Sequence, residues 1–135
     1  MRQRILKPEI WSEPAFVKLG CRGKLLYLAL HNYADDYGMF ERDHLKIVAS
    51  LFSSEYDNYI TIMESLFNDL ENGSLIIPFE YGVGENKRKL YYIAGWETSQ
   101  CVSHKGKPRH IHKDDLDDLM WEIERKYVEV EPVDI

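Results

Sequence analysis

The hydrophobic periodicity of the chain changes at Gly73, and this change constrains the fold more than any other feature of the sequence. Before Gly73, apolar residues recur at helical spacing in three segments, residues 22–34, 43–52 and 58–71. We expect the first helix to be apolar and covered on nearly every side, and Asp43 to form the N-cap of the second. After Gly73, the pattern becomes that of β-strands. A chain that changes its period in this order predicts a small helical core followed by strands.

Two β-rich runs, residues 74–81 and 89–96, flank a loop of glycine, asparagine and charged residues. Such an arrangement is typical of a β-hairpin. Residues 39–41 can form only a small strand, which follows a turn where we expect Gly38 to adopt a positive φ. The order predicts an α+β, mainly helical winged helix-turn-helix, with a three-helix core and the hairpin as its wing. The alternative is a generic α+β domain with the same elements packed otherwise.

The length of 135 residues suits one domain, within which we distinguish three parts. We expect the winged helix and an N-terminal arm in residues 1–97, with Trp11 packed onto the body. Residues 98–113 are polar and basic with little periodicity, which predicts an extended basic tail. Residues 114–135 predict an acidic amphipathic C-terminal helix that Asp114 caps.

The formal net charge of −6 argues against a nucleic-acid partner, but the charge is segmented along the chain. Residues 83–113 hold seven Lys or Arg against two Glu, between acidic blocks at 35–82 and 114–135. Phosphate binding needs cations on a protruding surface, because counterion release drives it. We therefore predict phosphate contacts from the wing and the tail, at Lys87, Arg88, Lys89, Lys105, Lys107, Arg109 and Lys113. The alternative is that these charges only keep a hairpin and a linker soluble.

Residues 58–71 would be the recognition helix of a winged helix, yet they contain no Lys or Arg. A helix that reads the major groove needs hydrogen-bond donors for phosphates and bases. Its acidic residues are Glu64, Asp69 and Glu71. Because these carboxylates would face a phosphate backbone, we expect little base readout from this helix and a low sequence specificity for DNA.

The C-terminal helix carries an apolar stripe and a tryptophan outside that stripe. An exposed tryptophan often marks a protein contact. The predicted protein-interaction residues are Leu116, Leu119, Trp121 and Ile123. They support a second hypothesis, in which the winged helix serves protein interaction or self-association and does not itself bind DNA.

The sequence contains none of the catalytic or nucleotide-binding motifs GxSxG, HExxH, the P-loop or GxGxxG, so we predict neither an enzyme nor a cofactor. The residues that come nearest to a metal site are Cys101, His104, His110 and His112. Its spacing matches no structural zinc pattern, so we predict no metal and expect the histidines to add charge below about pH 6.5. Asp35 and Asp36 precede a glycine turn, which we expect them to stabilise.

The sequence also predicts a cytoplasmic protein without a membrane partner. No apolar run is long enough to span a bilayer, and the N-terminus lacks the apolar segment of a signal peptide. The two cysteines, Cys21 and Cys101, form no CxxC pair, which fits a reducing compartment.

Two segments carry a more specific resemblance, Arg-Ile-Leu-Lys-Pro-Glu-Ile-Trp at residues 4–11 and Ala-Asp-Asp-Tyr-Gly-Met-Phe-Glu at residues 34–41. Over residues 4–100 the chain resembles the replisome-organiser, or replication-initiation, proteins of phages and prophages, whose N-terminal domain is a winged helix. The resemblance implies an accessory role in DNA replication inside a bacterial host cell, with a helicase or helicase loader as partner. The chain departs from the family at residues 97–100, where only the glutamine of a Lys-His-Gln-like segment remains. Fuller members continue into a second domain, so we expect a small relative or a fragment.

Overall fold

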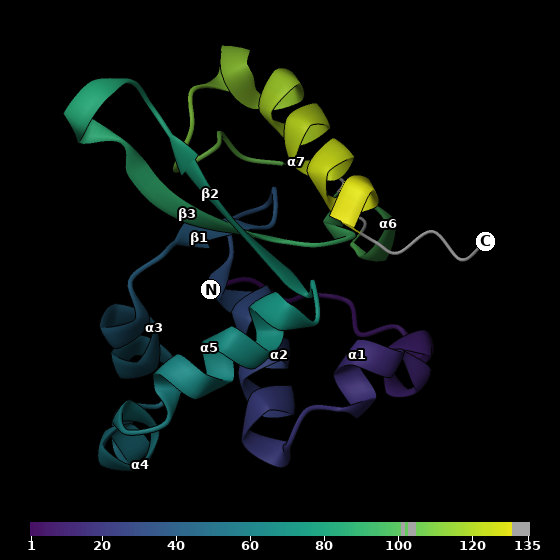
Figure 1. The fold of residues 1–135 in the computed structure, drawn as a ribbon, viewed down its shortest axis with the longest axis vertical. Helices are drawn as coiled ribbons and strands as arrows, with labels where there is room; N and C mark the ends of the chain where they lie inside the picture. Colours follow the sequence, from purple (N-terminus) through teal and green to yellow (C-terminus); the bar gives the residue numbers. More distant parts are fainter. Residues whose placement is uncertain (101, 103–104, 131–135) are drawn as a thin grey trace.

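A three-stranded antiparallel sheet lies between two layers of helices (Figure 1). The computed structural model describes residues 1–100, 102 and 105–130 of the chain. The strands follow the order β1-β3-β2 across the sheet, with bounds β1 (Met39–Glu41), β2 (Ile76–Tyr81) and β3 (Arg88–Ile93). The fold is therefore α+β and mainly helical, as the sequence predicts.

The helices before β2 cover one face of the sheet, which we call the inner face (Figure 1). They are α1 (Pro14–Val17), α2 (Cys21–Tyr33), α3 (His44–Leu51), α4 (Tyr56–Ile60) and α5 (Met63–Asn72). Leu26 and Leu30 of α2 are fully buried, whereas Leu25 is 52% exposed. The expectation that α2 is apolar and covered on nearly every side is therefore wrong at Leu25. The predicted N-cap of α3 is confirmed, because the Asp43 carboxylate accepts from the Lys46 N–H at 3.1 Å.

The third predicted helix, residues 58–71, is two helices in the structure. The α-helical hydrogen-bond pattern is interrupted at Thr61 and Ile62, where the Ile62 N–H donates to the Tyr59 carbonyl at 3.1 Å, and it resumes in α5. Residues 60–62 are Ile-Thr-Ile, three consecutive β-branched residues with reduced helix propensity. Tyr59, 2% exposed, stacks on Phe52 at 4.0 Å between ring centroids, so packing holds α4 where propensity is weak.

The second hairpin strand is shorter than predicted. It ends at Ile93, and Gly95 adopts a φ of 73° that starts the short helix α6 (Trp96–Ser99). Trp96 is therefore helical, and its indole N–H donates to the Asp36 carbonyl at 2.9 Å. Gly38 has the predicted positive φ, 77°, and a Cβ there would lie 2.6 Å from Cγ of Trp96.

The opposite, outer face of the sheet is covered by α7 (Leu116–Val130), which follows the 3-10 turn η4 (Lys113–Asp115) (Figure 1). Ile111 and Ile123 belong to the same buried cluster as the inner helices and strands. Residues 105–113 therefore pack onto the sheet instead of extending away from it. The predicted cap is wrong, since His112 accepts from the Asp114 N–H at 3.2 Å.

The N-terminal arm includes a 3-10 turn, η1 (Pro8–Ser12), just before α1. Lys7 is extended, with φ −79° and ψ 143°, as expected for a residue before proline. Trp11 packs edge-on against the buried Phe16 ring, at 5.6 Å between ring centroids, while 58% of it stays exposed. The predicted packing of Trp11 onto the body is therefore confirmed only in part. None of the helices that the structure describes combines the length and apolar character needed to cross a bilayer.

Candidate nucleic-acid interface

Arg88 connects the hairpin to residues 105–113, which we call the basic segment. Its Nη1 donates to the His110 carbonyl at 2.9 Å, and its Nη2 lies 3.2 Å from Nδ1 of His110. The two basic clusters predicted from the sequence therefore meet at this contact. Arg88 itself is engaged in holding them together.

Two further hydrogen bonds fix the course of the basic segment. The Gly106 N–H donates to Oδ2 of Asp36, and the His112 N–H donates to the Tyr81 hydroxyl, each at 2.9 Å. The segment thus runs from the turn after α2 to the end of β2. Residues 105–112 form no helix or strand, and the segment is bound at both ends. The predicted extended tail of residues 98–113 is wrong at its start, because Thr98 and Ser99 belong to α6.

Five predicted phosphate-contact residues are exposed and form no ion pair with any residue that the structure describes. They are Lys87, Lys89, Lys107, Arg109 and Lys113. Because strand side chains alternate between faces, Lys87 and Lys89 point to the inner face, whereas Arg88 points to the outer face and the basic segment. Free cations therefore lie on both sides of the hairpin.

Lys105 differs from the other predicted residues. Its Nζ lies 3.0 and 3.1 Å from the two carboxylate oxygens of Glu97 and 5.0 Å from the centroid of the Tyr37 ring. Its charge is already balanced within the protein, so it is the least suited of the set to bind phosphate.

Burial lowers the pKa of His110 below its ordinary value, although the carboxylates of Asp35 and Glu41 act in the opposite direction. His110 therefore gains its charge at a lower pH than a free histidine does. That the tail histidines add charge below about pH 6.5 stays a prediction. Cys101 and His104 lie outside the described residues, among which no three His, Cys, Asp or Glu gather as a metal site.

A groove of about 650 Å³ separates the inner side of the hairpin from the starts of α3 and α5. Lys87 and Lys89 line one side of it. Its acidic side chains are Glu41, Asp43 and Glu64. The groove is thus basic along the hairpin and acidic along the helices.

His44 is a groove residue for which sequence reasoning found no role. Its Nδ1 lies 2.8 Å from Oε1 of Glu64, its Nε2 lies 2.8 Å from the Tyr91 hydroxyl, and its ring stacks on Phe67 at 4.0 Å. Burial raises the pKa of Tyr91, whose hydroxyl therefore stays protonated. These contacts join α3, α5 and β3, and Tyr91 itself is 1% exposed.

The exposed face of α5 is polar and acidic, as the sequence predicts. Glu64, Ser65, Asn68 and Asp69 are exposed, and α5 contains no Lys or Arg. Glu71 is partly buried, so it contributes less to this face than expected.

Asp35 and Asp36 have separate roles. Oδ1 of Asp35 accepts from the N–H groups of Tyr37 and Met39 at 2.9 and 3.0 Å, which confirms the predicted stabilisation of the turn. Asp36 pairs with Arg2 and Arg4 of the arm in addition to Gly106. Burial acts to raise the pKa of Asp36, but the Gly106 N–H and the two guanidinium groups together hold that pKa below its ordinary value.

The predicted protein-interaction residues are mostly turned inward. Ile123 is 3% exposed, and Leu116 and Leu119 are partly buried against the core. Trp121 is 61% exposed, with the Arg125 guanidinium 5.4 Å from its ring centroid. Of the four, Trp121 is the residue that α7 presents to the outside.

No protein-family model matches the chain, and no curated protein matches it. Among proteins of known structure, the chain is similar to one described as the N-terminal domain of DNA binding protein, with 19% sequence identity and a TM-score of 0.44. That similarity covers 94% of this chain and 88% of the other.

Proposed function

We propose that the protein is a non-enzymatic DNA-binding module with a winged-helix fold, which contacts phosphates through the hairpin and the basic segment. The observation that carries this proposal is the pair of hydrogen bonds from Arg88 to His110. They hold two basic stretches, distant in the sequence, next to each other at one end of the sheet. The order of helices and strands and the β1-β3-β2 sheet support the winged-helix assignment.

Unpaired exposed cations suit this role, because a lysine without an internal partner can neutralise a phosphate and release the counterion condensed on the DNA there. Lys87 and Lys89 protrude on the hairpin, and Lys107 and Arg109 lie on the segment that Arg88 binds. By contrast, the acidic face of α5 disfavours insertion into a major groove. The hairpin therefore makes the main contacts with DNA, and the binding has low sequence specificity.

The start of α7 limits the strength of this binding. Asp114 and Asp115 follow the basic segment directly and are exposed. Their carboxylates repel phosphate on that side, although they favour the N-terminus of a helix. We therefore expect binding that is clear at low salt and is lost steeply as salt rises.

The biological setting follows from the resemblance over residues 4–100. We propose an accessory role in phage or prophage replication initiation, in the cytoplasm of the bacterial host, beside a helicase or helicase loader. Trp121, exposed on α7, is the residue we assign to contact such a partner.

The test is fluorescence anisotropy with labelled duplex and single-stranded DNA of two unrelated sequences, over a salt series. Lys107→Gln is compared with Lys18→Gln, because both positions are exposed lysines and both changes remove one charge. We expect weaker binding and a shallower salt dependence for Lys107→Gln and no change for Lys18→Gln. Folded protein that shifts neither DNA at low salt contradicts the proposal.

A second candidate function is protein interaction or self-association without DNA binding, favoured by the exposure of Trp121. Light scattering of the wild type and of Trp121→Ala tests self-association directly. A concentration-dependent oligomer that Trp121→Ala dissociates, in a protein that binds no DNA, would favour this second function over the first.

A further inference from the structure

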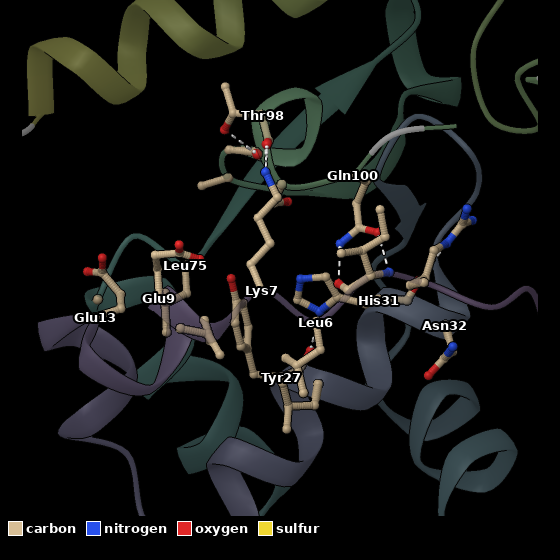
Figure 2. A pocket seen from close by; sticks show the side chains of 18 of the residues that line it. Leu6, Lys7, Glu9, Glu13, Tyr27, His31, Asn32, Leu75, Thr98 and Gln100 are labelled. Carbon is tan, nitrogen blue, oxygen red and sulfur yellow. Dashed lines mark hydrogen bonds between the residues drawn. The ribbon is translucent and has the colours of Figure 1, made fainter. Parts of the chain in front are cut away.

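A pocket of about 720 Å³ lies between the N-terminal arm, α2 and the start of α6 (Figure 2). None of the residues that line it belongs to the hairpin loop or to the basic segment. The pocket is therefore separate from the proposed DNA-binding surface, and the function proposed above gives it no role.

The arm forms a fixed wall of this pocket. The side chain of Gln100, 6% exposed, accepts from the Ile5 N–H and donates to the Ile5 carbonyl, both at 2.9 Å (Figure 2). The backbone N–H and carbonyl of Ile5 are thus both held by one buried side-chain amide. Lys7 reaches across to α6, where its Nζ donates to the Thr98 carbonyl at 2.7 Å. A wall held in this way is formed before any ligand binds.

His31 presents a hydrogen-bond acceptor to the pocket. Its Nδ1 lies 2.8 Å from the Tyr27 carbonyl, which can only accept, so Nδ1 carries the proton. Nε2 is then a lone-pair acceptor, and it forms no hydrogen bond with a described residue. Burial lowers the pKa of His31, and the nearby Arg4 guanidinium lowers it further, so the ring is neutral at pH 7. The ring packs against Trp96 and Tyr27, which fixes its direction.

The remaining polar groups of the pocket include two carboxylates, the Lys7 ammonium that donates to Thr98, and donors that bond to the protein itself. Glu9 and Glu13 line it and form no ion pair with a described residue. The side-chain donors Arg4, Asn32 and Gln100 all bond to the protein itself. Apolar surface comes from both the arm and the body, namely from Leu6, Ile10, Leu28 and Leu75.

We propose that this pocket binds a small primary amine that carries an apolar group. The ammonium lies by the carboxylates of Glu9 and Glu13, away from the Lys7 ammonium that Thr98 holds, and donates a hydrogen bond to Nε2 of His31. The apolar group packs against the aliphatic side chains of the wall. A carboxylate ligand of the same shape is disfavoured in this position, because it would face the carboxylates of Glu9 and Glu13 and the acceptor Nε2 of His31.

The test is an NMR titration of the full chain with 2-phenylethylamine and, separately, with 3-phenylpropionate at the same ionic strength. We expect saturable shifts of the Gly95 and Ser74 amides and of the His31 imidazole nitrogens with the amine alone. A double variant, Glu9→Gln with Glu13→Gln, should weaken amine binding roughly threefold to tenfold. Glu55→Gln, an exposed glutamate outside the pocket, is the matched control and should leave the affinity unchanged.

No saturable shift of pocket resonances with the amine overturns the proposal. So does equal or tighter binding of 3-phenylpropionate, and so does full affinity in the double glutamine variant. Retained spectral dispersion in each variant shows that it is folded. Because the readout does not involve DNA, this result is independent of the DNA-binding test.

Discussion

The N-terminal arm and the basic segment both carry clustered Lys and Arg residues, yet the structure uses their charges differently. Arg2 and Arg4 are paired with Asp36, and the side chain of Arg4 is only 5% exposed. Lys107 and Arg109, in contrast, are exposed without an ionic partner among the described residues. A basic run in a sequence therefore indicates where cations are, whereas the distribution of carboxylates decides which of them remain available to phosphate.

Asp36 contacts both regions, so its removal gives the largest expected effect. Asp36→Ala leaves the buried Arg4 guanidinium without its carboxylate and should lower the free energy of unfolding by about 3 kcal/mol. Urea unfolding followed by circular dichroism measures this change. Asp57→Ala removes an exposed aspartate and should cost far less. Equal losses in the two variants would mean that the arm is not anchored through Asp36.

The second prediction compares the two regions as DNA ligands. A combined variant with Lys87→Gln, Lys89→Gln, Lys107→Gln and Arg109→Gln should lower DNA affinity at fixed salt, and the salt slope should fall by about 0.9 for each lost phosphate contact. Arg2→Gln changes the same kind of charge in the arm and should leave affinity unchanged. Anisotropy at several salt concentrations measures both quantities. An equal loss of DNA affinity in Arg2→Gln would show that the cations of the arm bind phosphate as well as those of the hairpin and the basic segment do.

The third prediction concerns acid stability. The folded-state pKa of Asp36 lies below its ordinary value of 3.8, so its stabilising contribution is complete above that value and is lost as the pH falls through the folded-state pKa. Asp36→Asn should therefore show a shallower loss of stability between about pH 5 and pH 2 than the wild type. Unfolding curves across this range measure the difference. Parallel pH profiles for the two proteins would contradict the assignment.

The smallest effect is expected on α5 and its neighbour α4. Asn58→Ala and Asn68→Ala should leave DNA affinity nearly unchanged, whereas a bidentate adenine contact would be worth about 1–3 kcal/mol. The measurement is anisotropy on the two unrelated sequences at one salt concentration. Selective loss on one sequence would show that the acidic helix reads bases and that our charge argument is wrong.

Local signals in the sequence predicted the features that depend on near neighbours. The Asp43 cap and the positive φ of Gly38 each follow from the chemistry of a few adjacent residues. The break at Thr61 falls in the β-branched run of residues 60–62, a local signal that the helical periodicity masked. The helical state of Trp96 was missed because it depends on the burial of this residue, which is a tertiary property. The hydrophobic periodicity locates these segments in the chain, but it does not fix the residues at which each helix or strand ends.

The candidate site was predictable only in part, for a related reason. The cations of the hairpin and of the basic segment are visible in the sequence, but their proximity depends on the contact between Arg88 and His110, 22 residues apart. The hydrogen bonds of His44 to Glu64 and Tyr91 span 20 and 47 residues, and no local sequence pattern predicts them. Likewise, an apolar stripe on α7 predicts that Leu116 and Ile123 are covered, but not that this chain's own sheet covers them.

The two hydrogen bonds between the side chain of Gln100 and the backbone of Ile5 have a consequence for the order of folding. They join residues 95 positions apart, among the most distant contacts in the chain. Contacts of such high sequence separation form slowly, because most of the chain entropy is lost before they can close. The binding partner of Ile5 exists only once β3 and α6 are in place. We therefore expect the arm to dock in the last step of folding and to detach first, so that its amides exchange hydrogen with solvent faster than those of β3.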